Sequence, residues 1–196
     1  MAALGVDPQL LIPAAVLWVL LPAYIGNATA TLPKGRGPPM DFGRLWKGDG
    51  RRILGPSKTW SGFMVGTLFP VPFGLLEQWL ITIAPPSLKL VPAFGTSLLG
   101  ALPVILLLSG GALLGDALGS FYKRRRNLPS GAPALLLDQL GFVFVPVALG
   151  ILLDPALFWA TFGSLEALGW LLVFTLGLHV GFNYIGYWTG LKKVPW

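Results

Sequence analysis

The chain has 196 residues, of which 54% are hydrophobic and only 11% are charged, and its formal net charge at pH 7 is +6. A soluble domain carries about 25% charged residues, so this chain cannot cover its surface with polar groups, and its composition indicates an integral membrane protein. The absence of cysteine excludes disulfides, thiolate metal sites and a cysteine nucleophile.

Five segments are apolar over about the 20 residues that a membrane-spanning helix needs. In chain order they cover roughly residues 8–31, 59–84, 93–120, 138–153 and 166–190, of which 138–153 is short for a span. We therefore predict an all-α integral membrane protein, a bundle of five transmembrane helices in which residues 1–196 form a single transmembrane domain. The two long loops of this arrangement are residues 32–58 and 121–137.

The basic residues are distributed unevenly along these segments. Thirteen of the fourteen lysines and arginines lie in the two long loops and the C-terminal tail. The positive-inside rule places that face in the cytoplasm, so five spans put the N-terminus outside and the C-terminus inside. Attraction to anionic membrane lipids accounts for part of the basic face, and we expect no nucleic-acid partner.

An aspartate stands near the end of the third segment, in "GDALGSFYKRRRN". On a helix, Asp116 would share a face with Ser120 and Lys123. The structural alternative is an ion pair between Asp116 and Lys123 or a neighbouring arginine. An ionisable group at membrane depth is a functional-site hypothesis by default, so we favour a functional role for Asp116.

A second aspartate, Asp138, opens the fourth segment. The third and fourth helices are expected to be antiparallel, which brings Asp116 and Asp138 to the same membrane boundary. Two carboxylates without histidine or cysteine suit a hard ion such as Mg²⁺. Because lysines and arginines surround them, we expect a phosphate as the third party, which is the combination used in phosphoryl-group chemistry.

The stretch "DGRRILGPSKTWSG", residues 49–62, has features of an anion site. Gly55 permits a close backbone approach, and Ser57 is predicted to cap the second helix and leave its first amides free for phosphate oxygens. The cations of this stretch are Arg51, Arg52 and Lys58. It is not a P-loop, because Pro56 and Ser57 interrupt that motif. The alternative is a basic juxtamembrane loop without a ligand.

Polar side chains also recur at helical spacing in the first and fifth segments. Such stripes usually join helices by hydrogen bonds, and this is the interpretation we favour for His179 and Tyr187. Asn27 and Asn183 lie near the predicted cytoplasmic ends of their helices. For these two a structural role and a nucleotide contact remain equally open.

Four stretches together resemble a known family. They are "DFGRLWKGDGRRILGPSKTWSG" (41–62), "GDALGSFYKRR" (115–125), "LLDQLGFV" (136–143) and "LHVGFNYIGYWTGLKKVPW" (178–196). In this order they resemble the CDP-archaeol synthases, which are related to phosphatidate cytidylyltransferases. One departure is Gly141, which stands where the resemblance leads us to expect the second aspartate of an L-D-Q-L-D element.

The resemblance implies a Mg²⁺-dependent enzyme of the cell membrane, multi-pass, with its active site facing the cytoplasm. Its partners would be CTP, an isoprenoid ether lipid phosphate and the surrounding membrane lipids. The reaction would transfer CMP from CTP to 2,3-di-O-geranylgeranylglycerol 1-phosphate, giving unsaturated CDP-archaeol and pyrophosphate for archaeal phospholipid biosynthesis.

The expected roles divide into two sets. The predicted catalytic residues are Asp116, Asp138, Lys58 and Lys123, of which the two aspartates would hold the metal. The predicted nucleotide-binding residues are Asn27, Arg51, Arg52, Gly55, Ser57, Lys58, Thr59 and Arg124.

Other functions remain open at this point. A CTP-dependent polyprenol kinase would transfer the γ-phosphate, and a phosphatidate-type cytidylyltransferase would act on other lipid phosphates. A transporter or channel would need polar residues through the whole membrane thickness, whereas here they gather at one face. A CDP-alcohol phosphotransferase would need a D-G-x-x-A-R element, which the chain lacks.

Overall fold

The computed structural model describes residues 11–130, 134 and 137–190. Within these ranges the secondary structure is helical and there is no strand, as predicted. The elements are α1 (Leu11–Thr29), α2 (Trp60–Leu68), α3 (Val71–Ile83), a 3₁₀ turn (Pro86–Leu88), α4 (Leu98–Arg125), α5 (Leu137–Leu153), α6 (Pro155–Phe162) and α7 (Leu165–Trp188).

Each of the five predicted segments contains helix, but the helices differ in their capacity to span a membrane. Three are long and apolar enough within the described residues: Leu11–Thr29, Trp60–Ile83 and Leu98–Arg125. A fourth span results if α6 and the first part of α7, which meet at a bend of 83°, are taken together. The apolar α5 is shorter, with 17 residues. The chain is therefore a membrane protein with three or four candidate spans by length and composition.

Several helix boundaries in the structure differ from the approximate ones expected from the sequence. Helix α4 begins at Leu98 instead of residue 93, because Ser97 caps it by accepting a hydrogen bond from the Gly100 amide at 3.0 Å. The same helix continues to Arg125, so residues 121–125 are helical and do not belong to a loop. The basic residues Lys123, Arg124 and Arg125 thus project from the last turn of a helix, where they are favourably placed in the field of its dipole.

Two further differences from the predicted helices occur at prolines, one at Pro70 and one at Pro155. The second predicted helix is divided at Phe69 and Pro70 into α2 and α3, in keeping with the missing amide hydrogen of proline. Helix α6 was not predicted, although Asp154 and Pro155 form a typical helix start. The Asp154 carboxylate accepts a hydrogen bond from the Leu157 amide at 3.1 Å.

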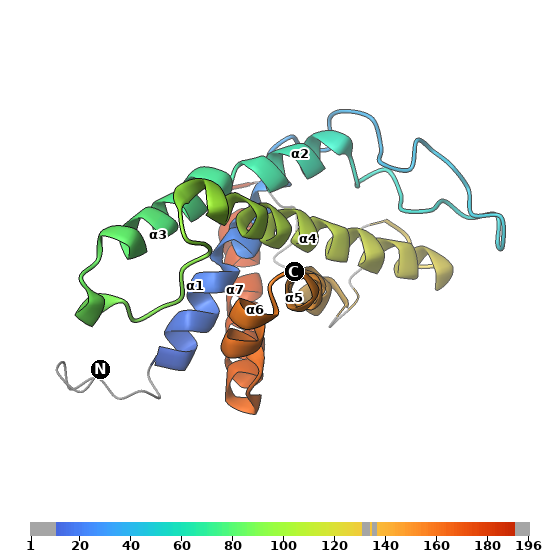
Figure 1. The fold of residues 1–196 in the computed structure, drawn as a ribbon. Helices are drawn as coiled ribbons and strands as arrows, with labels where there is room; N and C mark the ends of the chain where they lie inside the picture. Colours follow the sequence, from blue (N-terminus) through green and yellow to red (C-terminus); the bar gives the residue numbers. More distant parts are fainter. Residues whose placement is uncertain (1–10, 131–133, 135–136, 191–196) are drawn as a thin grey trace.

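Helix α4 is the centre of the fold and contacts α1, α2, α3 and α5. Figure 1 shows α4 lying across the molecule while α5 is viewed nearly end-on and α7 runs in a third direction, so the helices do not form a parallel bundle. The buried core follows α4 with Ala101, Ile105 and Leu108, which are fully buried against residues of α1 and α5 to α7.

Glycines bring α4 and α5 into close contact. Gly111, Gly115 and Gly119 occupy successive turns of α4, and a Cβ atom on Gly115 would overlap the backbone of α5. Their neighbours on α5 are, in order, Pro146, Gly141 and Leu137. Because these partners follow in reverse order, the two helices are antiparallel, as predicted. Small residues are what allow such close approach between helices in a membrane.

A buried acid lies on α3, away from the basic loops. Glu77 is 5% exposed, and within the described part of the chain neither of its carboxyl oxygens has a hydrogen-bond partner. Its neighbour Gln78 is satisfied, since its carbonyl oxygen accepts from the Phe94 amide at 2.8 Å and its amide donates to the Gly95 carbonyl at 2.8 Å. An unpaired buried carboxyl is unfavourable for stability.

Candidate functional site at the basic end of α4

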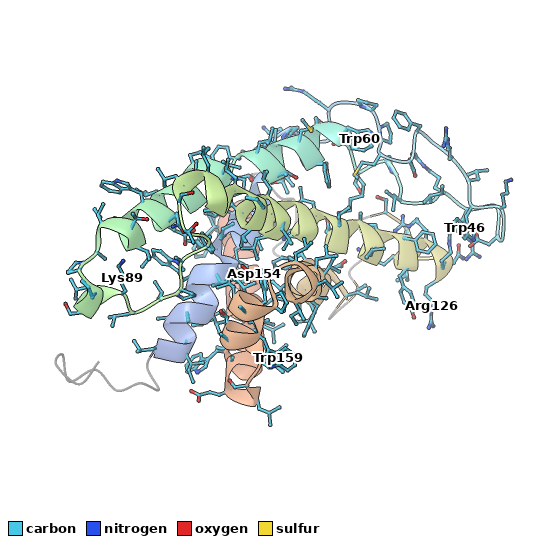
Figure 2. All side chains as sticks on the ribbon, viewed as in Figure 1. Trp46, Trp60, Lys89, Arg126, Asp154 and Trp159 are labelled. Carbon is cyan, nitrogen blue, oxygen red and sulfur yellow. The ribbon has the colours of Figure 1, made fainter. Side chains whose placement is uncertain are left out.

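The loop of residues 32–58 folds back on itself as an irregular hairpin beside the C-terminal end of α4 (Figure 1). Two isolated bridges close it, one between Pro39 and Thr59 and one between Leu45 and Arg52. Figure 2 shows Trp46 of this hairpin close to Arg126 at one end of the molecule, with Lys89 at the other. The basic loops therefore gather at one end, in agreement with the predicted asymmetry of charge.

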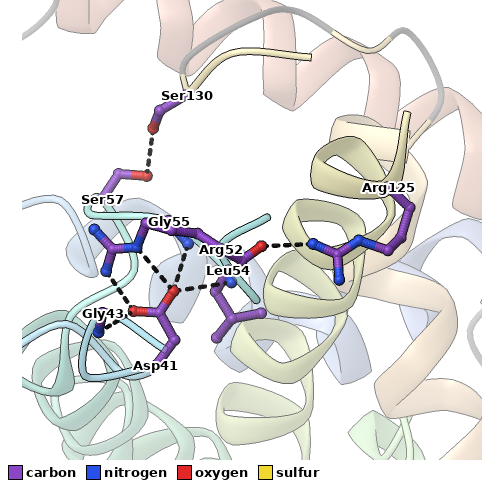
Figure 3. Close-up of polar contacts among 8 residues, drawn as sticks. All are labelled: Asp41, Gly43, Arg52, Leu54, Gly55, Ser57, Arg125 and Ser130. Carbon is purple, nitrogen blue, oxygen red and sulfur yellow. Dashed lines mark hydrogen bonds and ion pairs between the residues drawn. The ribbon is translucent and has the colours of Figure 1, made fainter. Parts of the chain in front are cut away.

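Asp41 organises the hairpin from inside (Figure 3). Its carboxylate accepts hydrogen bonds from the amides of Gly43, Leu54 and Gly55 at 3.1, 3.0 and 2.9 Å. The Arg52 guanidinium adds an ion pair at 2.5 Å, and the Asp41 side chain is fully buried. Burial by itself would raise the pKa of the Asp41 carboxyl, but the bonds from Arg52 and the three amides outweigh it and hold that pKa well below its usual value.

The sequence interpretation missed Asp41, although a signal for it was present. An aspartate two residues before a glycine favours a local turn in which the carboxylate accepts a backbone hydrogen bond, and the bond from the Gly43 amide to Asp41 is of this kind. Gly43 has a positive φ of 78°, which glycine adopts without strain. What the sequence did not indicate is that Arg52 and Gly55 would converge on the same carboxylate.

These contacts assign structural partners to residues that were predicted to bind a nucleotide. Arg52 is paired with Asp41, and Arg51 donates from its guanidinium to the Arg125 carbonyl at 3.0 Å. The Gly55 amide donates a hydrogen bond to Asp41, and Gly55 has a φ of 112°. Only glycine adopts this conformation without strain. Arg51, Arg52 and Gly55 therefore shape the hairpin whether or not they also touch a ligand.

Arg125 joins the hairpin to the last turn of α4. Its guanidinium forms an ion pair with Asp49 at 3.0 Å and donates to the Arg52 carbonyl at 2.6 Å, the second contact being drawn in Figure 3. The same guanidinium lies 4.8 Å from the centre of the Phe121 ring and 5.8 Å from that of Trp46. Cation–π contacts of this kind add to the ion pair, so the hairpin is docked on α4 by charge and by aromatic packing.

The four predicted catalytic residues meet in two ion pairs. Lys58, at the base of the hairpin, donates to Asp116 of α4, and Lys123 of α4 donates to Asp138 of α5 at 2.6 Å. All four side chains are partly buried, between 11% and 28% exposed. The second oxygen of Asp138 accepts from the Ala134 amide at 2.9 Å. The alternative ion pair between Asp116 and Lys123 is not the one formed.

The carboxylates of Asp116 and Asp138 would suit a Mg²⁺ ion whose other ligands are water and substrate phosphates. Among the described residues no cluster of three or more acidic, histidine or cysteine side chains is present. Mg²⁺ is typically held by one or two carboxylates and completed by water and substrate phosphates. Asp116 and Asp138 supply that number of carboxylates at the same end of α4 and α5.

A third group of predicted residues lies next to the segment after α4. Ser57 and Ser130 share a hydroxyl hydrogen bond of 3.3 Å, which Figure 3 shows. Arg124 donates to the Pro129 carbonyl at 2.9 Å, and one of its terminal nitrogens would be 3.6 Å from a Cβ atom on Gly55. The hairpin and the segment 128–130 therefore face each other across Arg124.

The predicted helix cap was wrong by two residues. Thr59, and not Ser57, caps α2, since its hydroxyl accepts from the Gly62 amide at 3.2 Å. The Thr59 side chain is 4% exposed and serves the helix start. Ser57 is left outside the helix and points towards Ser130.

The two asparagines have different outcomes. Asn27 is half-buried on α1, and its side chain forms no hydrogen bond with another described residue. It adjoins Gly26, where α1 approaches Gly66 of α2 closely. The side chains of His179 and Asn183 lie outside the described residues, as does the basic C-terminal tail.

Comparison with known proteins identifies the family. The family model described as "CarS-like: CDP-archaeol synthase" matches residues 9–196. The CDP-archaeol synthase of Thermococcus gammatolerans is 45% identical over 180 residues, covering 92% of this chain and 94% of the relative. The chain belongs to the CDP-archaeol synthase family. A second member, from Methanococcoides burtonii, is 39% identical over 178 residues and is matched along 100% of its length, against 90% of this chain.

A solved structure has a similar fold. It is described as an intramembrane enzyme for archaeal membrane lipid biosynthesis, and its TM-score with this chain is 0.59 at 32% identity. The likeness covers 82% of this chain and 90% of that one. Membership of the CDP-archaeol synthase family also makes this chain an enzyme, a cytidylyltransferase of the membrane.

The packing of α4 against α5 bears on Gly141, which stands where the family resemblance leads us to expect an aspartate. A Cβ atom on Gly141 would be 3.1 Å from the Gly115 carbonyl oxygen, closer than an ordinary contact. A side chain at this position would therefore press on α4 at its closest point of approach to α5. The two aspartates that remain at this end, Asp116 and Asp138, are those with lysine partners.

Proposed function

We propose that this chain transfers CMP from CTP to 2,3-di-O-geranylgeranylglycerol 1-phosphate, with release of pyrophosphate. The observation that carries the proposal is the paired arrangement of Lys58 with Asp116 and Lys123 with Asp138. The pairs combine acceptors for a cation with donors for phosphate at the basic end of a membrane protein of the CDP-archaeol synthase family.

The chemistry requires little acid–base assistance from the protein. An oxygen of the lipid phosphate attacks the α-phosphorus of CTP, the new O–P bond forms, and the bond from that phosphorus to the bridging oxygen of pyrophosphate breaks. The attacking oxygen is already ionised, so no strong general base is needed. The chain's contribution is to position the two anions and to offset their negative charge.

The lysines are suited to exchange partners when substrate binds. Each donates to an aspartate, and the Lys58 and Lys123 side chains are 22% and 11% exposed. A triphosphate with a lipid phosphate carries far more negative charge than two carboxylates, so Lys58 and Lys123 gain by turning from the aspartates to phosphate oxygens. Arg124, beside Gly55 and Ser57, is the third cation in reach of the hairpin.

The aspartates released by this exchange would hold Mg²⁺. Bound by Asp116 and Asp138, the ion would supply Lewis-acid stabilisation of the charge on the transferring phosphate. Two carboxylates at one boundary, without histidine or cysteine, support this choice of metal.

We also propose the topology of five spans, with the N-terminus outside and the basic end in the cytoplasm. The positive-inside rule supports this orientation. Helix α5 has 17 residues and is about 25 Å long, which crosses a hydrocarbon layer of about 30 Å with modest local thinning. Water-soluble CTP would then enter from the cytoplasm, and the lipid phosphate would arrive from the inner leaflet.

Labelled nucleotide tests the proposal directly. Purified protein is incubated with Mg²⁺, the geranylgeranyl lipid phosphate and CTP that carries ³²P at either the α or the γ position. We expect the α-label in the lipid and the γ-label in pyrophosphate. Transfer of the γ-label to the lipid would identify a kinase instead, and turnover with phosphatidate in place of the ether lipid would identify a different lipid specificity.

A matched omission experiment tests the metal. Removal of Mg²⁺ with a chelator is expected to abolish label transfer, and addition of Mg²⁺ in excess over the chelator is expected to restore it. Full activity in the chelated sample would contradict the role proposed for Asp116 and Asp138.

A further inference from the structure

The outer part of the hairpin, residues 42–47, carries large apolar side chains that are exposed over about half of their surface or more. Phe42, Leu45 and Trp46 are 63%, 59% and 46% exposed, although they stand in the most polar region of the chain. They are interleaved with two exposed cations, Arg44 and Lys47. We call residues 42–47 the hairpin tip. Its composition of aromatic, aliphatic and basic side chains is typical of segments that lie at a membrane surface.

The hairpin tip is held in a defined shape. Phe42 has a φ of 48°, a left-handed conformation that is unfavourable for a residue with a large side chain. It is kept there by the hydrogen bond from its amide to the Pro39 carbonyl at 3.0 Å and by the Asp41 turn beside it. Hydrogen bonds therefore fix the backbone conformation that exposes Phe42.

The contact between the hairpin tip and α4 indicates its depth. The Trp46 ring packs edge-on against Phe121, with ring centres 5.2 Å apart. Along the helix axis Phe121 lies about 35 Å from Leu98, or about 33 Å for a helix tilted by about 20°. The hydrocarbon core is about 30 Å thick, and the headgroup layers extend the bilayer to about 40–45 Å. Phe121 and Trp46 therefore reach the level of the headgroups, where tryptophan is enriched.

The positive charges of the hairpin tip, on Arg44 and Lys47, favour contact with an anionic membrane surface. Neither Arg44 nor Lys47 forms an ion pair with another described residue, whereas the buried Asp41 and the docking Asp49 are both paired. The cytoplasmic leaflet is negative and attracts basic residues next to a transmembrane helix. Free cations beside exposed aromatic rings complement such a leaflet.

We propose that the hairpin tip inserts Phe42, Leu45 and Trp46 into the headgroup boundary of an anionic bilayer beside the end of α4, with Arg44 and Lys47 on the lipid headgroups. This contact holds the hairpin, and Lys58 at its base, at the surface of the leaflet. The contact itself does not depend on the reaction; its effect on lipid capture rests on the proposed function.

The absence of cysteine from the chain allows a clean test. The full-length variant Leu45→Cys is labelled with the fluorophore NBD and reconstituted in bilayers that contain phosphatidylglycerol. Ser130→Cys, an exposed position on the segment after α4, serves as the control. We expect the label at position 45 to shift to shorter wavelength and to be quenched by lipids with a nitroxide near the headgroup. The label at position 130 is expected to be quenched by aqueous iodide.

Two outcomes would overturn the proposal. Iodide quenching at position 45 as strong as at position 130, without quenching by the nitroxide lipid, would show that the hairpin tip lies in water. Equal nitroxide quenching in bilayers of neutral phosphatidylcholine would remove the role of Arg44 and Lys47.

Measurement of KM for each substrate distinguishes a failure of this inference from a failure of the proposed function. The double variant Phe42→Ser/Leu45→Ser is expected to raise KM for the lipid substrate and to leave KM for CTP unchanged. An increase in KM for CTP alone would mean that the hairpin tip covers the nucleotide instead of the membrane. If the wild-type protein had no transferase activity, the fluorescence result would still stand and only the proposed function would fail.

Discussion

The contact between Gly115 and Gly141 offers a matched pair of substitutions at the closest approach of α4 and α5. A Cβ atom on Gly115 would overlap the Gly141 carbonyl group and would lie 3.1 Å from the Cα atom of Phe142. These are backbone atoms, so a change of rotamer cannot relieve the clash. A Cβ atom on Gly141 meets nothing closer than 3.1 Å and then 3.6 Å. We therefore expect Gly115→Ala to disturb the crossing far more than Gly141→Ala.

The size of the difference follows from these distances. For Gly115→Ala the Gly141 carbonyl carbon has to retreat from 2.7 Å to the 3.4 Å at which ordinary contact begins. Overpacking of this kind costs about 1–3 kcal/mol. Alanine gains about 0.5–1 kcal/mol over glycine in a helix, and this gain applies to both variants. Their difference in the free energy of unfolding is therefore expected to be about 1–3 kcal/mol, with Gly141→Ala close to the wild type.

The assay is unfolding of the purified protein in mixed micelles, with SDS as the denaturant and tryptophan fluorescence as the signal. Activity is measured in parallel, because a wider crossing also moves Asp116 away from Asp138. A misplacement of about 1 Å can cost about 10²-fold in rate, so we expect Gly115→Ala to lower kcat by about 10-fold to 10²-fold.

The comparison of the two variants decides the interpretation. Equal unfolding midpoints for Gly115→Ala and Gly141→Ala would refute the close approach of the two backbones. A normal midpoint with normal activity in Gly115→Ala would also refute the argument that this crossing sets the spacing of the aspartates.

Three further predictions follow from individual side chains. Asp116→Asn and Asp138→Asn should each lower kcat at least about 10²-fold without changing the circular dichroism spectrum, and near-normal activity in either would remove that residue from the metal site. Asp41→Asn should expose the hairpin to trypsin, because the ionised Asp41 carboxylate stabilises the folded hairpin. The pKa of Asp41 is lowered in the folded state, so this stabilisation is complete above the usual pKa of 3.8 and is lost only as the pH falls below it. The protection of the wild-type hairpin from trypsin should therefore be constant between about pH 5 and 8. Glu77→Leu should raise the SDS midpoint by the equivalent of about 1–3 kcal/mol, because it removes an unpaired buried carboxyl; a lower midpoint would mean that Glu77 has a partner that stabilises the fold.

Much of the architecture was predictable because it depends on local composition. The apolar segments became helices, and the resemblance based on four short stretches was confirmed by the family match. Among the described residues the gathering of basic residues at one end was also confirmed, with Arg126 and Lys89 at opposite ends of the molecule. Helix ends were less predictable, because caps such as Ser97 and Thr59 compete with other polar residues nearby.

What the sequence by itself determined is therefore that the long apolar segments form helices, which basic residues gather at one end of the described part of the molecule and which acids stand there. Hydrophobicity and charge are properties of single side chains, so they can be assigned without knowing which residues each side chain contacts in the fold. Only the tertiary structure decided the pairing: Lys58 with Asp116, Lys123 with Asp138, and Asp41 with Arg52 inside the hairpin. The physical reason is that each ion pair joins groups from different parts of the chain, which no local pattern brings together. For Lys123 and Asp138, the glycines on α4 and α5 permit the close approach of the two helices that carry them.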